Sequence, residues 1–469
     1  MLRSNARVSL CLAPCMAALL TACGGGDEAT SGTTLTLEVP DGAVVTNACS
    51  AERLEVSLQS HDAIVDGSPR RMVVMVTCGS GVIRRGGVPV DWQIVEGGGK
   101  IDGRATVRST TDTNGVTEAL WTFGTDGPVQ TLEARLSPTQ HASLTHTLLP
   151  RRADPCREPA VTDLGAARVV TGVEVWTRSG SPYATRCASG ATCSEAITVA
   201  PGARLEMEAG VAVCARRLVV DGQARLVATG SAEEPVHLRL RTGIVLQAAP
   251  HGVPGIPSQL RHVYAESNDG IGAAGHPVVI EDSILRRVPA GEADAECPTV
   301  ALRQHALSGV TPSRVQRTVI DGFGMLPNPW DYGPVCAGLQ IEIGDTTPPL
   351  QASARILNSL GEGLYFLVAA GARDVAQTQL SQCEVSGSAG IGVFATVPPG
   401  ADAAPRVTGC NVLGNALAGV VGPGIGATTV DARANWWGDA EGPAGTRGDG
   451  VGAGVDATQP LIAPLELGY

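Results

Sequence analysis

The chain repeats itself near its C-terminus at an offset of 27 residues. Residues 380–394 align with residues 407–421, and Cys383 and Cys410 fall at the same position of the two copies. The repeat is short, contains glycines and alternates β-branched residues, which predicts strands joined by tight turns in a solenoid. Residues at one position of adjacent solenoid turns, here called rungs, lie about 4.8 Å apart. Because a disulfide spans a Cα separation of roughly 4.4–6.8 Å, Cys383 and Cys410 can join two rungs.

The same matching of positions predicts further disulfides. Cys193 and Cys214 match at an offset of 21 residues, with apolar residues following in step, and Cys297 and Cys336 also share a position. Metal binding is the alternative use of these cysteines, but the chain has no Cys-x-x-Cys pair and no histidine at ligand spacing from a cysteine. We therefore expect no metal and five disulfides, the last two assigned by elimination: Cys383–Cys410, Cys193–Cys214, Cys297–Cys336, Cys156–Cys187 and Cys49–Cys78.

Composition favours an all-β protein with thin cores. Hydrophobic residues make up 43% of the chain but aromatic residues only 3%, and 59 glycines and 31 prolines punctuate it throughout. Small aliphatic side chains suit stacked strands, and frequent turn residues argue against long helices. The formal net charge of −12 makes nucleic acid an unfavourable partner, because an acidic surface repels phosphate backbones.

The N-terminus has the pattern of an export signal. An apolar run at 8–20 follows two arginines and leads into Leu20-Thr21-Ala22-Cys23 and a glycine-rich stretch. This pattern resembles a bacterial lipoprotein lipobox, which implies a signal peptide over 1–22, a lipid on Cys23 that anchors the protein to the outer membrane, and a polar tether over 23–33. An ordinary secretory signal with an incidental cysteine is the alternative. The resemblance leaves open whether the protein faces the periplasm or the cell surface.

Residues 34–150 contain short alternating segments separated by turn residues, which predicts a β-sandwich. The segments at 90–101, 111–116 and 121–124 resemble the bacterial Ig-like repeats of invasin and intimin surface proteins. In that family Trp92 corresponds to a core residue and Asn114-Gly115 to a turn. The proline-containing stretch 151–159 is expected to be the linker to the next domain.

Residues 160–469 are expected to form the solenoid. The segments 197–210 and 218–230 resemble the opening coils of right-handed parallel β-helix proteins, and Asn435-Trp436-Trp437-Gly438-Asp439 with Gly442-Pro443 resembles the terminus of many bacterial members. Two tryptophans can cover the open apolar end of a solenoid. Stacking of Trp436 and Trp437 on a carbohydrate is the alternative function of this motif.

Insertions are expected between rungs at 289–298 and 326–334. The second contains Trp330 and Tyr332, which are candidate ligand contacts because solenoid insertions project from one face and often carry binding residues. The alternative is that both aromatic residues cover a loop closed by a disulfide.

Right-handed β-helices include pectate lyases and polygalacturonases, whose catalytic sites need several acids close together. The acids of residues 260–325 are not matched in position from rung to rung; they are Glu266, Asp269, Glu281, Asp282 and Asp321. We therefore expect them to form a solvated polar face, and we expect no catalytic residues and no cofactor site. The tripeptide Arg447-Gly448-Asp449 is short enough to be a chance match to an integrin ligand. The sequence thus favours a non-catalytic, lipid-anchored envelope protein that binds a polysaccharide or a surface protein. A surface polysaccharide lyase or glycoside hydrolase acting in the solenoid groove is the alternative.

Overall fold

The structure is a computed structural model. It describes residues 52–56, 69–78, 83–84, 86–136, 143–148, 155–157, 162–186, 195–250, 256–288, 297–304, 313–325, 335–344, 350–372, 375–399, 401, 403–423, 428–444 and 449–467. Within these ranges the protein is all-β, with four short 3₁₀ turns and no α-helix. No helix of the described part is long and apolar enough to span a membrane.

Two antiparallel sheets form the N-terminal part, called here the two-sheet domain. The first contains β1 (Glu52–Val56), β2 (Arg70–Cys78), β3 (Ile83–Arg84), β5 (Lys100–Ile101) and β7 (Val116–Thr122), and the second β4 (Pro89–Gly97), β6 (Thr106–Thr110), β8 (Asp126–Leu136) and β9 (Ser143–Leu148). Alternate residues of both sheets meet in one core, in which Trp92 and Trp121 are the largest side chains. The alternation in the sequence therefore predicts which face of each strand is buried.

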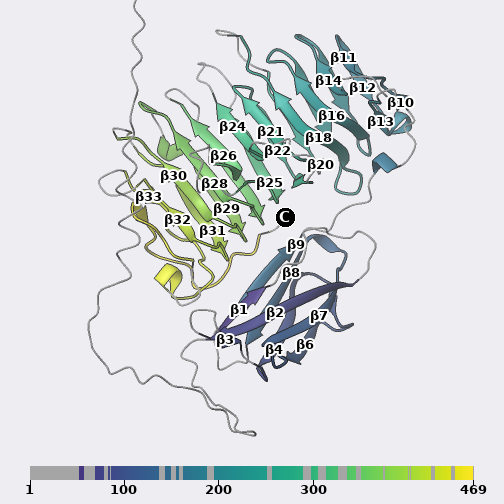
Figure 1. Ribbon diagram of the computed structural model, residues 1–469. Coiled ribbons are helices and arrows are strands. Elements are labelled where there is room, and N and C mark those ends of the chain that lie inside the picture. Colours follow the sequence, from purple (N-terminus) through teal and green to yellow (C-terminus); the bar gives the residue numbers. More distant parts are fainter. Residues whose placement is uncertain are drawn as a thin grey trace, which may run out of the picture. The chain divides into compact units, whose positions relative to one another are not determined.

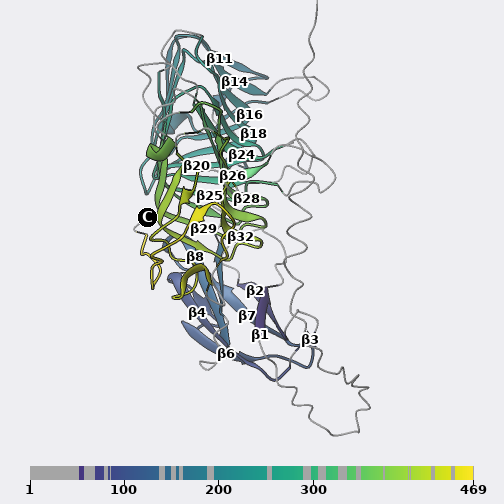
Figure 2. The same ribbon diagram turned by 90° about the vertical axis from the view of Figure 1, so that its left-hand side faces the viewer.

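The remaining strands belong to one sheet of 25 strands, called here the parallel-sheet domain. Each strand pairs in parallel with a strand one rung later, a pattern compatible with a β-helix solenoid. Figure 1 shows the strands stacked in chain order from teal to yellow, and the turned view of Figure 2 shows the same stack from β11 to β32. The strands are β10 (Thr162–Asp163), β11 (Arg168–Val170), β12 (Val173–Trp176), β13 (Tyr183–Ala184), β14 (Ala196–Val199), β15 (Arg204–Met207), β16 (Ala212–Val220), β17 (Arg225–Thr229), β18 (Val236–Leu246), β19 (Ser258–Arg261), β20 (Val263–Ser267), β21 (Gly270–Ala274), β22 (Val278–Glu281), β23 (Ile284–Arg287), β24 (Thr299–Gln304), β25 (Arg314–Asp321), β26 (Ala337–Ile343), β27 (Gln351–Leu357), β28 (Glu362–Val368), β29 (Gln379–Ser386), β30 (Ile391–Thr396), β31 (Arg406–Leu413), β32 (Ala418–Val421), β33 (Val430–Asp431) and β34 (Val455–Asp456).

One continuous hydrophobic core fills the parallel-sheet domain from Val170 to Trp437. Its members are mostly Val, Leu, Ile and Ala, as the composition predicts, because a rung encloses too little space for many aromatic rings. Parallel stacking places like residues above each other, so each apolar side chain contacts its counterparts in the rungs before and after.

One bend recurs in register along the stack, and we call it corner A. In six rungs one residue at this bend adopts the left-handed backbone conformation, with φ between 45° and 66°. These residues are His262, Asp282, Arg317, Gln382, Gly409 and Ala434. A left-handed residue turns the chain sharply without a loop, so the strands on either side stay aligned from rung to rung. The β27 rung has one residue fewer here, and the Ser353 hydroxyl accepts a hydrogen bond from the Arg317 N–H at 3.2 Å across the irregularity.

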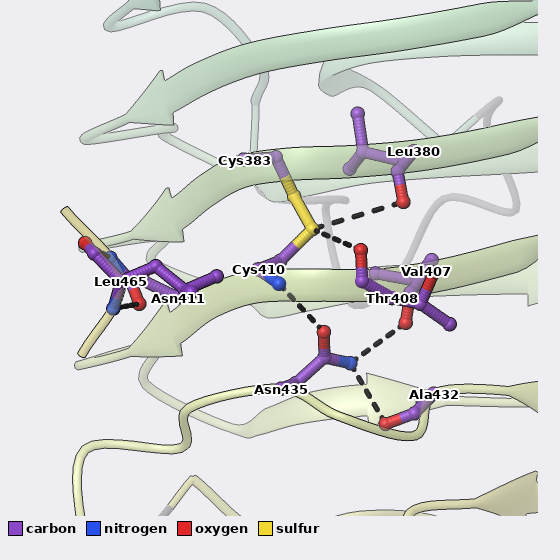
Figure 3. The surroundings of a disulfide bond; sticks show 9 residues. All are labelled: Leu380, Cys383, Val407, Thr408, Cys410, Asn411, Ala432, Asn435 and Leu465. Atoms are coloured by element: carbon purple, nitrogen blue, oxygen red, sulfur yellow. Dashed lines mark hydrogen bonds between the residues drawn. A yellow bond between two sulfur atoms is a disulfide. The ribbon is translucent and has the colours of Figure 1, made fainter. Parts of the chain in front are cut away.

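The residues that follow corner A are matched in position and include the cysteines of the repeat. Cys383 and Cys410 pair directly in the β29–β31 register, with a Cα separation of 4.5 Å and a disulfide between them (Figure 3). The predicted Cys297–Cys336 disulfide is also present, with a Cα separation of 5.3 Å. Matching of positions along the repeat therefore predicts both bridges correctly.

The predicted partners of Cys214 and Cys156 are wrong. Cys214 is bonded to Cys156, at a Cα separation of 5.8 Å, and not to Cys193. The 21-residue offset is right for the strands, since Ile197 pairs with Leu218, but Cys214 lies opposite Ala184 in the register. Cys156 reaches it from the 3₁₀ turn η1 (Pro155–Arg157), which packs on β16.

Several predictions lie outside the described residues. These are the signal peptide 1–22, the tether 23–33 with the lipid site Cys23, and the side chains of Cys49, Cys78, Cys187 and Cys193. The predicted start of the sandwich at residue 34 also precedes the first described strand, and Trp330 and Tyr332 fall in an undescribed segment.

Candidate functional sites

The terminal Asn-Trp-Trp motif continues the ladder at corner A. The Asn435 side-chain oxygen accepts a hydrogen bond from the Cys410 N–H at 2.9 Å, and its amide donates to the carbonyls of Val407 and Ala432 at 2.7 and 2.8 Å (Figure 3). Ser283 has the same role five rungs earlier, since its hydroxyl accepts from the Val263 N–H and donates to the Glu281 carbonyl. Asn435 is therefore a structural residue of the last rungs.

The two tryptophans of the motif differ in exposure. Trp437 is fully buried, belongs to the main core and contacts the backbone near Gly419. Its ring exposes no face to a carbohydrate, and this burial favours capping over the ligand role for Trp437. Trp436 is half-buried, and its backbone pairs with β31 through the Cys410 carbonyl and the Val412 N–H.

Asp449, the last residue of the Arg-Gly-Asp tripeptide, points inward. Its carboxylate accepts hydrogen bonds from the N–H groups of Gly414 and Asn415 and from the Asn415 amide, at 2.7 to 3.0 Å. Burial raises its pKa, against the effect of these donors. A carboxylate used in this way cannot bind an integrin metal ion, which agrees with a chance match.

Arginines and acids alternate along one column of the parallel-sheet domain, where most of them are buried. The register places Arg239, Glu266, Arg286 and Asp321 one rung apart in succession. Arg239 forms an ion pair with Glu266, and Arg286 one with Asp321 at 3.6 Å. The expectation that the acids of this region are unmatched in position is wrong for Glu266 and Asp321. Both are buried beside an arginine, so the column resembles an internal ion-pair ladder more than a catalytic groove.

The next column contains a buried arginine between two glutamates. Arg355 on β27 donates to Glu384 on β29 at 2.8 Å and to both carboxylate oxygens of Glu96 on β4 at 2.7 and 2.8 Å. The Arg355 side chain is 5% exposed, and the charges of both glutamates raise its pKa against the opposing effect of burial. Apolar contacts between Val129 of β8 and Val319 and Leu357 accompany this ion pair.

Glu362, at the start of β28, is a buried acid of a different kind. It is 7% exposed, and its Oε2 atom has no hydrogen-bond partner among the described residues. Burial raises its pKa. Nearby Tyr365 donates to or accepts from the Thr396 hydroxyl at 3.0 Å and stacks on Phe394, and burial together with the charges of Glu342 and Glu362 raises its pKa. Glu362 is not predictable as a site residue from the sequence, because a lone acid in an apolar strand carries no spacing signal.

Two polar cavities open on the first rungs of the parallel-sheet domain. One of about 340 Å³ is lined by the Arg178–Glu234 ion pair, Glu233 and His237. The other, of about 450 Å³, is lined by the Cys156–Cys214 disulfide and by three arginines, Arg216, Arg239 and Arg241. Neither cavity was predicted, because the sequence does not reveal where the register breaks. In the described ranges no group of three or more His, Cys, Asp or Glu side chains is arranged to hold a metal ion.

Comparison with protein-family models, with curated proteins and with solved structures finds no match to this chain.

Proposed function

We propose that the protein is a lipid-anchored component of a bacterial cell envelope, facing the periplasm or the cell surface, whose parallel-sheet domain is a non-catalytic binding surface for a glycan or another surface protein. The lipobox-like Leu20–Cys23 supports an anchor in the outer membrane. An acidic protein needs such an anchor, because anionic head groups repel it.

The proposal includes a finer assignment of both domains. We take the two-sheet domain as Ig-like and the parallel-sheet domain as a right-handed β-helix. Support for the first comes from the buried Trp92, whose indole N–H donates to Ser109 at 2.7 Å. The Asp112 carboxylate also accepts from the N–H groups of Asn114 and Val116 around the left-handed Gly115, as an Asn-Gly turn requires.

The pairing of charges across rungs is the observation that carries a non-catalytic role. Acids along the stack are neutralised by arginines of neighbouring rungs, and the pairs are Arg239–Glu266, Arg286–Asp321, Arg355–Glu384, Arg317–Asp282 and Arg406–Asp431. Lyases and hydrolases acting on polysaccharides need acids that are available for Ca²⁺ or for proton transfer. Carboxylates held by arginines are better suited to stabilising a scaffold.

Glu362 favours the second candidate function, a polysaccharide lyase or glycoside hydrolase. A buried carboxyl group with a raised pKa can act as a general acid at neutral pH. Inverting and retaining hydrolases both need a second carboxylate at a defined distance. Glu342 is the candidate, because its charge acts on Tyr365 together with that of Glu362.

A panel of acidic and neutral polysaccharides incubated with the purified protein tests both candidates. Binding without new unsaturated or reducing ends is the expected result. Product formation that is abolished by Glu362→Gln but not by Glu281→Gln, an acid on the outer face of β22, would replace the non-catalytic proposal with the enzymatic one. If the protein neither binds nor cleaves any polysaccharide of the panel, the proposal is restricted to a protein partner.

A further inference from the structure

The first rung of the parallel-sheet domain has one side of its strands open. β11 and β12 each pair in parallel with a strand of the second rung, and no earlier rung precedes them in the described chain. The carbonyls of Val170 and Trp176 accept hydrogen bonds from N–H groups of the second rung at 2.9 and 3.1 Å. Because backbone groups alternate in direction along a strand, those of Val169, Val173 and Val175 point away from the second rung.

The side chains along this edge are apolar and exposed. Val169, Val173 and Val175 are 54%, 71% and 50% exposed, and β11 and β12 lie at the teal end of the stack (Figure 1). At the other end, later residues cover the described last rung, since the Leu461 N–H donates to the Asn435 carbonyl at 2.9 Å. An exposed apolar strand edge is a template for pairing with another chain, so the first rung is a docking surface for an extended strand.

Charges on the inner side of the same strands restrict which strand can dock. Arg168 and Glu174 alternate with the valines and form an ion pair at 2.6 Å across the bend between β11 and β12. Glu174 also accepts a hydrogen bond from the Trp176 indole N–H at 3.3 Å. A strand that placed an apolar residue over these charges would remove them from water without a partner. The docked strands must therefore bring one charge of each sign.

We propose that a second copy of this chain occupies the edge, in a symmetric dimer joined through the first rungs. Thr171 lies at the bend, midway in sequence between Arg168 and Glu174. A two-fold axis through Thr171, in the plane of the first rung, places β11 of each copy antiparallel to β12 of the other. Val169 then exchanges both backbone hydrogen bonds with Val173 of the second copy, and Arg168 lies opposite Glu174 of the second copy.

The geometry limits the assembly to two copies. The same edge is used by both partners, so the interface is self-complementary and closes. A second copy supplies what the edge requires, namely valines on the outer side and both charges on the inner side. This inference goes beyond the proposed function and does not depend on glycan binding.

Sedimentation velocity of the full-length protein tests the dimer, whose mass is twice 47.9 kDa. We expect the dimer fraction to rise with protein concentration. Arg168→Glu and Glu174→Arg are each expected to weaken dimerisation at least tenfold, because both symmetric contacts then join like charges. An equal mixture of the two variants is expected to recover the wild-type affinity, because an acid then meets an arginine at both contacts. Neither variant regains its internal ion pair in the mixture, so recovery reports a contact between copies.

A matched pair of valine variants tests the strand edge itself. Val169→Asp is expected to weaken dimerisation at least tenfold, because it places a charge in the centre of the paired strands. Val95→Asp, at a valine of the two-sheet domain that is equally exposed at 55%, is expected to dimerise as the wild type does. Circular dichroism and the melting temperature verify that each variant is folded, as expected for exposed positions.

Three results would overturn the inference. A wild-type protein that stays monomeric at every concentration excludes the dimer. Dimers that are unaffected by the charge and valine variants use another surface. A mixture of Arg168→Glu and Glu174→Arg that stays as weak as each variant alone shows that these residues do not meet across the interface.

Discussion

Single polar side chains satisfy backbone hydrogen-bonding groups at corner A, and Asn435 does so in the last rungs. Asn435→Ala leaves the Cys410 N–H and the Val407 and Ala432 carbonyls without their partner in a buried place. Each such loss costs about 1 kcal/mol or more, so we expect the free energy of unfolding to fall by about 3 kcal/mol in urea titrations. The exposed Asn114→Ala should change it by less than about 0.5 kcal/mol. Equal effects of the two variants would contradict the role of Asn435.

The buried carboxyl group of Glu362 makes the free energy of unfolding depend on pH, in a way that differs from the effect of the other acids. Its pKa in the folded protein is raised from 4.5, so ionisation favours the unfolded state, and its contribution to stability is lost as pH rises through the folded-state pKa. Glu362→Gln removes this loss.

We therefore expect the variant to gain stability over the wild type as pH increases from 4.5 to 8, measured as the difference between urea midpoints. Asp431 has a lowered pKa because Arg433 donates to its carboxylate, so its contribution to stability is fully present above its ordinary value of 3.8 and is lost only as pH falls through the folded-state pKa. Asp431→Asn should therefore differ from the wild type by a constant amount between pH 4.5 and 8. A difference between Glu362→Gln and the wild type that is independent of pH would show that Glu362 is not held neutral.

At the scale of the strand and the turn, the Cys383–Cys410 bridge joins β29 to β31 across a loop of 27 residues. Loop-closure entropy predicts that removing it as Cys383→Ala/Cys410→Ala destabilises the protein by about 3 kcal/mol. Both cysteines are fully buried, so small cavities add to the loss. The melting temperature of the double variant, compared with that of the wild type under non-reducing conditions, measures this. Equal melting temperatures would show that the stacked strands hold this bend without the bridge.

The sequence predicts the strands better than the partners of residues outside them. Register could be predicted where both rungs have the same length, as for Cys383 and Cys410, because one offset then applies along the whole rung. It failed for Cys214, whose partner comes from a 3₁₀ turn that belongs to no rung. The arginine cavity and the Arg355 site were not predicted, since the first depends on a bulge and the second joins residues 259 apart in sequence.

For the whole molecule, the Arg355 site is the described ionic link between the two-sheet and parallel-sheet domains. Residues 50–469 form one compact unit. Arg355→Met leaves Glu384 buried without a cation and removes the bidentate pair with Glu96. Loss of one partner of a buried ion pair costs roughly 3–5 kcal/mol, so the denaturant midpoint should fall strongly.

The control for that prediction is Arg433→Met, which removes an exposed ion pair with Asp431 and should cost no more than about 1 kcal/mol. Glu96→Gln is informative as well, because it weakens the link and leaves the Glu384 pair in place. If Arg355→Met and Arg433→Met have the same effect on the midpoint, the link between the domains is not a source of stability.

Corner A also determines how a chain of this kind can grow. The bend takes up one left-handed residue in most rungs and accepts no insertion between β29 and β33. The connections from β27 to β28, from β29 to β30 and from β31 to β32 also keep one length, whereas those that lead into β29, β31 and β33 differ in length. One rung can therefore be copied as a module if the cut is made on either side of this bend. A gene in which the segment 383–409 is duplicated should encode a longer, folded stack, so the length of the protein is a property that evolution or an engineer can change in whole units.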